Sequence, residues 1–399
     1  MLTKLLTKLL TKLLIGILPV TPYLIGCLNE NRLRTMTFRE EFWDAFSKIE
    51  ISRDLLPEKA AEKLNEIEAR LRPHLPKSVF KYRSCNSRNF DALARNVIYA
   101  VPASYMNDPF DGLVYVDIDK IINDIKYGQS REFWEHIKEY GKLPESMEAF
   151  LTKESYDELL KLLTSLTNDE IEEKERTNSE NLPDLISSVR SLVESLLVEL
   201  QKTTLICSFA SDYKQSSMWA YYAEDHTGYV VEYAVNGDRL DKCATCSKCY
   251  RGCHKNKVRA QLYPMVYLEE RYDATSHIDY TLGMYALQSC GITSNNVYPD
   301  MMFFDKCCLI KGKQWENESE WRVVCHQEPI MNEHIPVPVS VYPPRAIYYG
   351  ARISDENYRL LHMVVQDLRA KGAEIKEYKM YMDLYSRDFT LKCKEITVN

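Results

Sequence analysis

Hydrophobic and polar positions follow two different periods along this chain, and the two periods separate expected helices from expected strands. A helical period runs through 37–49, 57–72, 216–223 and 356–371, and most of 120–200 is also helical in character. Short apolar runs rich in β-branched and aromatic residues are typical of strands. Such runs occur at 80–83, 97–100, 203–210, 228–235, 262–267, 321–325, 346–350 and 374–378. Because the two types are mixed without regular alternation, we expect an α+β fold with a mixed or antiparallel sheet core.

The acidic stretch 117–200 interrupts this pattern and predicts a helical insertion that packs on the core or covers it. Within it, residues 168–181 are almost entirely polar and charged. Such a composition predicts a mobile connector, because it offers few apolar groups to bury. A helical period returns at 185–200.

The first 35 residues have a pattern of their own. Leu-Thr-Lys-Leu occurs three times between Leu2 and Leu13, and an apolar run interrupted by prolines follows. One interpretation is a signal peptide or lipoprotein anchor ending at Cys27. A second is that the natural protein starts at Met36, after the tandem repeat, and a third is an amphipathic helix. The second favours a cytoplasmic protein, and the first would attach the protein to a membrane.

These patterns divide the chain into four parts. We expect an N-terminal segment at 1–35, N-terminal helices at 36–77, a core at 78–352, and a C-terminal helix and strand at 353–399. The core would contain the helical insertion 117–200 and a cysteine-rich loop at 240–260.

The cysteine-rich loop carries the most specific local motif. Cys243, Cys246, Cys249 and Cys253 are separated by two, two and three residues, and His254 follows. Four closely spaced thiols in a chain of this size are typical of metal ligation rather than of a disulfide framework. Zinc and an iron–sulfur cluster are both compatible with this spacing. A metal-stabilised hairpin without chemistry of its own is the plain structural alternative.

Composition restricts the remaining possibilities. The formal net charge is -7, so the surface as a whole does not attract nucleic acid, although the basic residues that flank the cysteines could form a local patch. Only 13 glycines are present, and neither a phosphate-binding loop nor a dinucleotide fingerprint occurs.

Four ordered segments resemble the bacterial domain-of-unknown-function 2971 family. They are Lys81-Tyr82-Arg83-Ser84, Met106-Asn107-Asp108-Pro109-Phe110-Asp111, the stretch 217–228 with Ser217-Met218-Trp219-Ala220-Tyr221-Tyr222-Ala223 and His226-Thr227-Gly228, and the stretch 313–322 ending in Glu318-Ser319-Glu320-Trp321-Arg322. The resemblance covers roughly 78–116 and 203–352, so the cysteine-rich loop would be an addition to a shared scaffold.

The order of these segments is also similar, at the level of the fold, to ADP-ribosyltransferases. That resemblance implies NAD as substrate, Arg83 as a phosphate clamp, Ser208 or Tyr222 as the middle residue, and Glu320 as the catalytic carboxylate. Glu318 would orient the nucleophile or act as base, since alternate residues of a strand share a face.

A second group of residues could form the ligand's aromatic wall. Trp219, Tyr222 and His226 lie three and four residues apart, so they would share one face of a helix that stacks on a nicotinamide or adenine ring. Such a stripe is equally typical of a hydrophobic core.

The leading hypothesis is therefore an NAD-dependent ADP-ribosyltransferase-like enzyme, of the kind found in toxins or phage defence, that acts on a nucleotide-type small molecule and a protein or nucleic-acid acceptor. The alternative is a non-enzymatic, metal-stabilised sensor that contacts nucleic acid or a protein. A third hypothesis is a magnesium-dependent nuclease using Asp108, Asp111 and Glu320.

Overall fold

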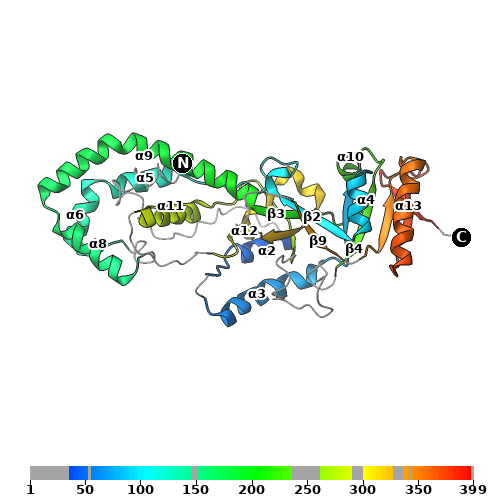
Figure 1. Ribbon diagram of the computed structural model, residues 1–399, viewed down its shortest axis with the longest axis horizontal. Coiled ribbons are helices and arrows are strands. Elements are labelled where there is room, and N and C mark those ends of the chain that lie inside the picture. Colours follow the sequence, from blue (N-terminus) through cyan, green and yellow to red (C-terminus); the bar gives the residue numbers. More distant parts are fainter. Residues whose placement is uncertain are drawn as a thin grey trace.

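The computed structural model describes residues 36–52, 55–144, 151–235, 261–289, 300–326, 336–341 and 343–396. Within them the expected mixture of helices and strands is confirmed, and the strands form more than one sheet. The molecule is elongated, with a helical arm at one end and the sheets at the other (Figure 1). The expectations for 1–35 and for the four cysteines lie outside the described residues.

The helices have the following bounds: α2 Phe38–Phe46, α3 Pro57–Leu71, α4 Ser87–Ala94, α5 Ile118–Gly128, α6 Arg131–Tyr140, α8 Lys153–Ser165, α9 Asn168–Thr203, α10 Ser216–Tyr222, α11 Thr275–Ser289, α12 Phe303–Cys307 and α13 Asp355–Ala370. Short 3-10 turns lie at Arg72–His74 (η1), Ala103–Tyr105 (η2) and Lys313–Glu318 (η3).

The strands are β1 Ser78–Arg83, β2 Val97–Pro102, β3 Thr204–Phe209, β4 Tyr229–Ala234, β5 Gln261–Pro264, β6 Val266–Leu268, β7 Ile310–Gly312, β8 Trp321–His326, β9 Val337–Ser340, β10 Ala346–Tyr349, β11 Lys376–Tyr381 and β12 Lys392–Glu395.

The two larger sheets have five described strands each. The first has the order β1-β4-β10-β11-β12, and the second has the order β5-β8-β3-β2-β9. Their pairs are antiparallel except for β10 and β11, which are parallel and are joined through α13. A bridge between Phe80 of β1 and Ala210, just after β3, links the two sheets. β6 and β7 form a small parallel pair.

The main hydrophobic core lies between these two sheets. Val79 and Val231 of the first sheet pack in one cluster with Cys207 and Val323 of the second, and Leu361 of α13 joins them. The alternate residues of each strand point the other way. In β8, for example, Val324 packs against Phe42 and Ile67 of the N-terminal helices. The second sheet is therefore buried on both faces, which fits its nearly continuous apolar strands.

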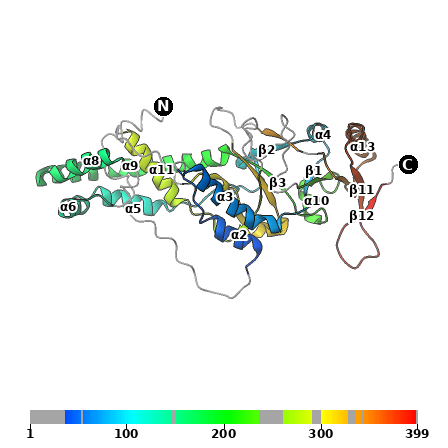
Figure 2. The same cartoon turned by 90° about the horizontal axis from the view of Figure 1, so that it is seen from below.

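The helical arm is formed by α5, α6, α8, α9 and α11 (Figure 1, Figure 2). Two apolar clusters hold it together, one around Ile125, Val189 and Leu282 and the other around Trp134 and Leu163. Four of these helices come from the stretch 117–203, and α11 comes from much later in the chain. No helix among the described residues is both long enough and apolar enough to cross a bilayer.

The predicted mobile connector at 168–181 is wrong, because α9 runs through it as one helix of 36 residues. Thr167 begins the helix with a capping box to Glu170, and Ile171 is buried against the arm. Arg176 pairs with Glu173 at 2.7 Å across one turn. Caps and pairs of this kind support a polar helix that has little apolar surface to bury.

Close packing of backbone at Gly228 fixes where β4 begins. A Cβ atom there would lie 2.1 Å from the carbonyl oxygen of Arg83. The preceding residues Glu224, Asp225 and His226 all have a positive backbone φ, which is unusual for residues other than glycine. The chain therefore leaves α10 through a tight left-handed turn, and only glycine fits at its end.

Replacing Gly228 by alanine tests this packing. We expect Gly228→Ala to lower the free energy of unfolding by about 3 kcal/mol, since backbone atoms cannot move away from the added methyl group. Gly141→Ala is the matched control, because Gly141 also lies in a turn but has open space around its Cα; its positive φ alone should cost about 1 kcal/mol. Urea denaturation measures both values. Equal losses in the two variants would contradict the packing argument.

Candidate functional site

Charged residues from distant parts of the sequence meet in one buried group beside β8. Asp111 comes from the loop after β2, Lys311 lies in β7, and Glu318 ends η3. Glu320 directly precedes β8, and Arg322 is its second residue. Each of these five residues is at most 5% exposed. We call them the charged cluster. Burial of so many charges is costly unless each is paired, so the contacts of each one matter.

Arg322 lies at the centre of the charged cluster and is fully buried. Its guanidinium donates to both carboxylate oxygens of Asp111, at 2.6 and 3.0 Å. It also donates to Glu320 Oε1 at 2.9 Å and to the carbonyl oxygen of Cys308 at 2.7 Å. The planar fork of arginine matches a carboxylate in this two-bond geometry, so the ion pair fixes the loop after β2 against β8.

Lys311 connects the remaining two carboxylates. Its ammonium group lies 2.7 Å from Glu318 Oε2 and 3.6 Å from Glu320 Oε2. The same group lies 4.5 Å from the centre of the Trp315 ring, which is a favourable place for a cation.

Glu318 and Glu320 share the charged cluster for a different reason from the one predicted. Glu318 ends a 3-10 turn instead of lying on the strand, and Ser319 between them has a φ of 46°. The Ser319 carbonyl oxygen accepts hydrogen bonds from Ser211 Oγ at 2.5 Å and from Arg39 at 3.1 Å. Arg39 of α2 also donates to the carbonyl oxygen of Glu320 at 2.7 Å. A left-handed turn held from two sides therefore points both carboxylates inward.

The charged cluster reaches the surface at Tyr222. The Tyr222 hydroxyl donates to Glu318 Oε1 at 2.6 Å and accepts from Asn107 Nδ2 at 2.7 Å. Tyr222 is half-buried and Asn107 is exposed. A continuous chain of hydrogen bonds thus runs from solvent through Asn107, Tyr222 and Glu318 to Lys311.

The protonation of these groups follows from their partners. Burial and the hydrogen bond to Glu318 raise the pKa of Tyr222 well above its ordinary value, so the hydroxyl remains a donor. Burial alone would raise the pKa of Glu320, but Arg322 and Lys311 outweigh it and hold that pKa below its ordinary value. Burial raises the pKa of Asp111 while Arg322 opposes it. Because arginine stays protonated and its N–H groups need acceptors, we take the Asp111–Arg322 pair as ionised.

Ser208 lies beside the charged cluster, since it is paired with Arg322 across the β3–β8 ladder. Its hydroxyl is buried and makes no regular hydrogen bond within the described residues. It is nevertheless close enough to Glu320 to help lower the pKa of that carboxylate.

The structure does not bring Arg83 into the charged cluster. On β1 the side chains of Val79, Lys81 and Arg83 share the face that looks onto the core between the sheets. Trp321 and Val323 of β8 pack in that core. Because neighbouring residues of a strand point to opposite faces, Glu320 and Arg322 point away from it. Arg83 acts electrostatically on Lys81 and Tyr229.

Trp219 is also separate from the charged cluster. It is fully buried, and its indole N–H donates to the carbonyl oxygen of Tyr213 at 2.7 Å. Its ring stacks with His226 at 6.3 Å, but His226 follows the helix instead of extending it. Of the predicted aromatic wall, Trp219 therefore belongs to the core, and Tyr222 contacts the charged cluster through Glu318.

Carboxylates for a metal ion do not gather in the described ranges. No group of three His, Cys, Asp or Glu side chains in them could hold a metal ion together. Asp111 and Glu320 are both bound by Arg322, and Asp108 Oδ1 accepts from the backbone N–H of Phe110 at 3.0 Å. Asp108 thus stabilises a turn, and this arrangement does not favour the magnesium-dependent nuclease.

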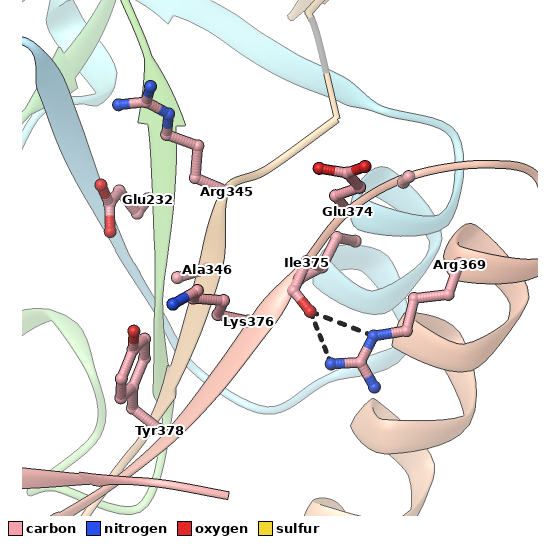
Figure 3. A pocket seen from close by; sticks show the side chains of 9 residues that line it. Glu232, Arg345, Ala346, Arg369, Glu374, Ile375, Lys376 and Tyr378 are labelled. Carbon is pink, nitrogen blue, oxygen red and sulfur yellow. Dashed lines mark hydrogen bonds between the residues drawn. The ribbon is translucent and has the colours of Figure 1, made fainter. Parts of the chain in front are cut away.

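A pocket of about 590 Å³ lies elsewhere, at the starts of β10 and β11 (Figure 3). Its charged side chains are largely occupied by neighbours: Arg369 donates to the carbonyl oxygen of Ile375 and pairs with Glu377 at 2.6 Å, and Glu232 accepts from Ser78 at 2.6 Å. No residue predicted from the sequence lines it, so it is the weaker candidate.

Three members of the site were not assigned a role from the sequence. Lys311 and Arg39 are ordinary basic residues in sequence, and only the fold shows that they bind carboxylates and carbonyls at Glu318–Glu320. Asn107 belongs to a turn-forming segment, which hid its contact with Tyr222. The one available signal for Lys311 was its position just before the segment 313–322.

Comparison with known proteins gives one match. A family model described as "Protein of unknown function (DUF2971)" matches residues 218–323. No curated protein and no solved structure matches the chain. The matched region contains Tyr222, Lys311, Glu318, Glu320 and Arg322, so most of the site lies within it.

Removing one partner of the central ion pair tests its role in stability. Asp111→Asn leaves the Arg322 guanidinium buried without its carboxylate, and we expect a loss of about 3–5 kcal/mol in the free energy of unfolding. Asp91→Asn removes a carboxylate from an exposed pair with Arg95 and should change little. Urea denaturation followed by circular dichroism compares the two variants. An unchanged midpoint for Asp111→Asn would contradict this assignment.

Proposed function

We propose that the protein is an ADP-ribosyltransferase-like enzyme whose reacting site is the surface end of the charged cluster. The observation that carries the proposal is the hydrogen-bonded chain from Asn107 through Tyr222 to Glu318. A carboxylate connected to solvent through one hydroxyl is a suitable general base, because it can receive a proton without being exposed itself.

The reaction would transfer the ADP-ribosyl group of NAD to an acceptor on a protein or nucleic acid. The bond between the ribose C1′ and the nicotinamide nitrogen breaks, and nicotinamide leaves with the bonding electron pair. A new bond forms between C1′ and the acceptor, and the acceptor loses a proton. An acceptor that replaces the exposed Asn107 amide would pass this proton to Tyr222, while Tyr222 passes its own proton to Glu318.

The position of Glu318 supports the same reaction. The carboxylates of Asp111, Glu318 and Glu320 are matched by the cations Lys311, Arg322 and Arg39, so the site as a whole has no net negative charge. Glu318 is the carboxylate that Tyr222 connects to the surface, and its charge would stabilise positive charge that develops on the ribose in the transition state. Glu320 would act indirectly, since Arg322 and Lys311 occupy its carboxylate.

The proposal assigns a narrower set of residues than the sequence did. Glu318 keeps its role as base, Tyr222 becomes the proton relay, and Glu320 acts indirectly instead of as the catalytic carboxylate. Lys311 joins them as the cation that orients Glu318. Arg83 and Trp219 would contribute to the stability of the fold and would not contact the substrate at this site, because neither lies in the charged cluster.

Turnover of NAD by matched variants tests the proposal. Release of nicotinamide and labelling of acceptors from NAD should fall by about 10²–10⁴-fold in Tyr222→Phe and in Glu318→Gln, because either change interrupts the proton path. The neighbouring exposed residues supply controls: Tyr221→Phe and Glu316→Gln should keep wild-type turnover. Failure of the folded wild-type protein to consume NAD, or equal turnover in Glu318→Gln, would remove the basis for this function.

We also propose that Cys243, Cys246, Cys249 and Cys253 bind zinc or an iron–sulfur cluster. Their spacing supports this, and so does their position in the connection from β4 of the first sheet to β5, the edge strand of the second. Metal ligation there would join the two sheets by a second route without supplying the chemistry at Tyr222.

Metal analysis of the purified full chain checks this second proposal. We expect about one zinc per chain, or iron with inorganic sulfide and a visible absorption band, and a loss of that metal in a Cys243→Ser/Cys246→Ser variant. Cys85→Ser is the control, since Cys85 lies far from these residues in sequence. Anaerobically purified protein without bound metal would refute metal binding.

A further inference from the structure

The connection between β11 and β12 exposes an unusual concentration of large apolar side chains. Leu384, Tyr385 and Phe389 are 85%, 96% and 102% exposed, and Met382 is 61% exposed. We call residues 382–391 the β11–β12 loop. It extends from the sheet end of the molecule in Figure 2, at the opposite end from the helical arm. Single exposed apolar residues are normal on protein surfaces, whereas a group in one short loop needs an explanation.

Hydrogen bonds within the β11–β12 loop give it a defined conformation in which these apolar side chains are exposed. The loop's own polar groups hold its backbone: Asp383 Oδ1 accepts from the N–H of Tyr385 at 3.1 Å, and Asp388 Oδ1 accepts from the N–H of Thr390 at 3.1 Å. Ser386 Oγ donates to Asp388 at 2.9 Å. Leu391, at the base, is buried in the core. The loop is therefore ordered in advance with its apolar side chains outward, which lowers the entropy cost of binding.

The charges of the loop indicate what could cover it. Asp383, Arg387 and Asp388 lie among the apolar side chains, and Lys392 lies 3.6 Å from Asp388. Two carboxylates near the tip would oppose contact with nucleic acid or with an anionic bilayer. A surface that carries both signs of charge can instead match a second copy of the same chain. In a two-fold contact the same surface of both copies meets in opposite directions, so a carboxylate of one copy can lie against a basic residue of the other.

The area is also of the right size. An aromatic side chain presents about 150–250 Å², so Tyr385 and Phe389 together supply roughly 300–500 Å². Leu384 and Met382 add to this. A standard interface buries about 800 Å² on each partner, so one loop and part of its surroundings would suffice. The edge strand β12 itself carries Lys392 and Lys394, which disfavour pairing of edge to edge.

We propose that the β11–β12 loop is a self-association surface that joins two copies of this chain about a two-fold axis. Leu384, Tyr385 and Phe389 provide the apolar centre of the contact, and the charged residues of the loop form its rim. This inference does not rest on the proposed chemistry at Tyr222, because it is argued from the exposed side chains and the charges of the loop alone.

Sedimentation velocity of the full chain over a range of concentrations tests the proposal. The wild-type protein should pass from monomer to dimer in the micromolar range. A Leu384→Ser/Tyr385→Ser/Phe389→Ser variant should raise the dissociation constant at least about tenfold, because it removes the apolar centre. These side chains are exposed, so the variant should fold normally. The matched control replaces Tyr140, Leu162 and Val198, which are exposed on the helical arm, by serine and should associate like the wild type.

Hydrogen exchange identifies the surface directly. The backbone amides of 384–389 should exchange more slowly at concentrations where the dimer forms, and those of the helical arm should not change. A monomer at all concentrations would overturn the proposal, and so would association that persists unchanged in the triple variant. Binding of monomeric wild type to phosphatidylglycerol vesicles, lost in the same variant, would assign the loop to a membrane instead and would also overturn it.

Discussion

The ion pair between Arg322 and Asp111 is the interaction on which the candidate site depends. A fully buried guanidinium must have an acceptor for each of its N–H groups, and Asp111, Glu320 and the carbonyl oxygen of Cys308 supply them. These acceptors come from three separate segments, so meeting the needs of one side chain brings a loop, a helix end and a strand together. Lys311, Glu318 and Tyr222 are then positioned around this arrangement.

The charged cluster is buried and rigidly held, yet it is connected to solvent through Tyr222. The two sheets enclose the main hydrophobic core on one side of β8, and the charged cluster lies on the other side, under the N-terminal helices. Arg39 of α2 donates to the carbonyl oxygens of Ser319 and Glu320, so the helices that precede the core also fix the direction of Glu318. Within the part of the chain that the structure describes, Tyr222 and Asn107 connect the charged cluster to solvent, which is why the proposed chemistry is placed there.

The region matched by the family model and the candidate site overlap in part. Residues 218–323 include Tyr222, Lys311, Glu318, Glu320 and Arg322, which the structure brings together. Asp111 joins them from outside the matched region. The helical arm and the β11–β12 loop lie at opposite ends of the elongated molecule (Figure 2).

The sequence by itself determined the mixture of helices and strands and most strand positions, because burial periodicity is a local property. It placed Glu318 and Glu320 on one face as strand neighbours, whereas a left-handed turn at Ser319 brings them together. The prediction of a mobile connector at 168–181 was wrong. The composition shows that the segment has few apolar groups, but it does not show the capping box and the ion pair that stabilise a helix there. Only the tertiary structure decided that Asp111 and Lys311 join the site and that Arg83 and Trp219 do not. Which face of a strand meets which segment depends on sheet order, and sheet order is set by contacts between residues far apart in the chain.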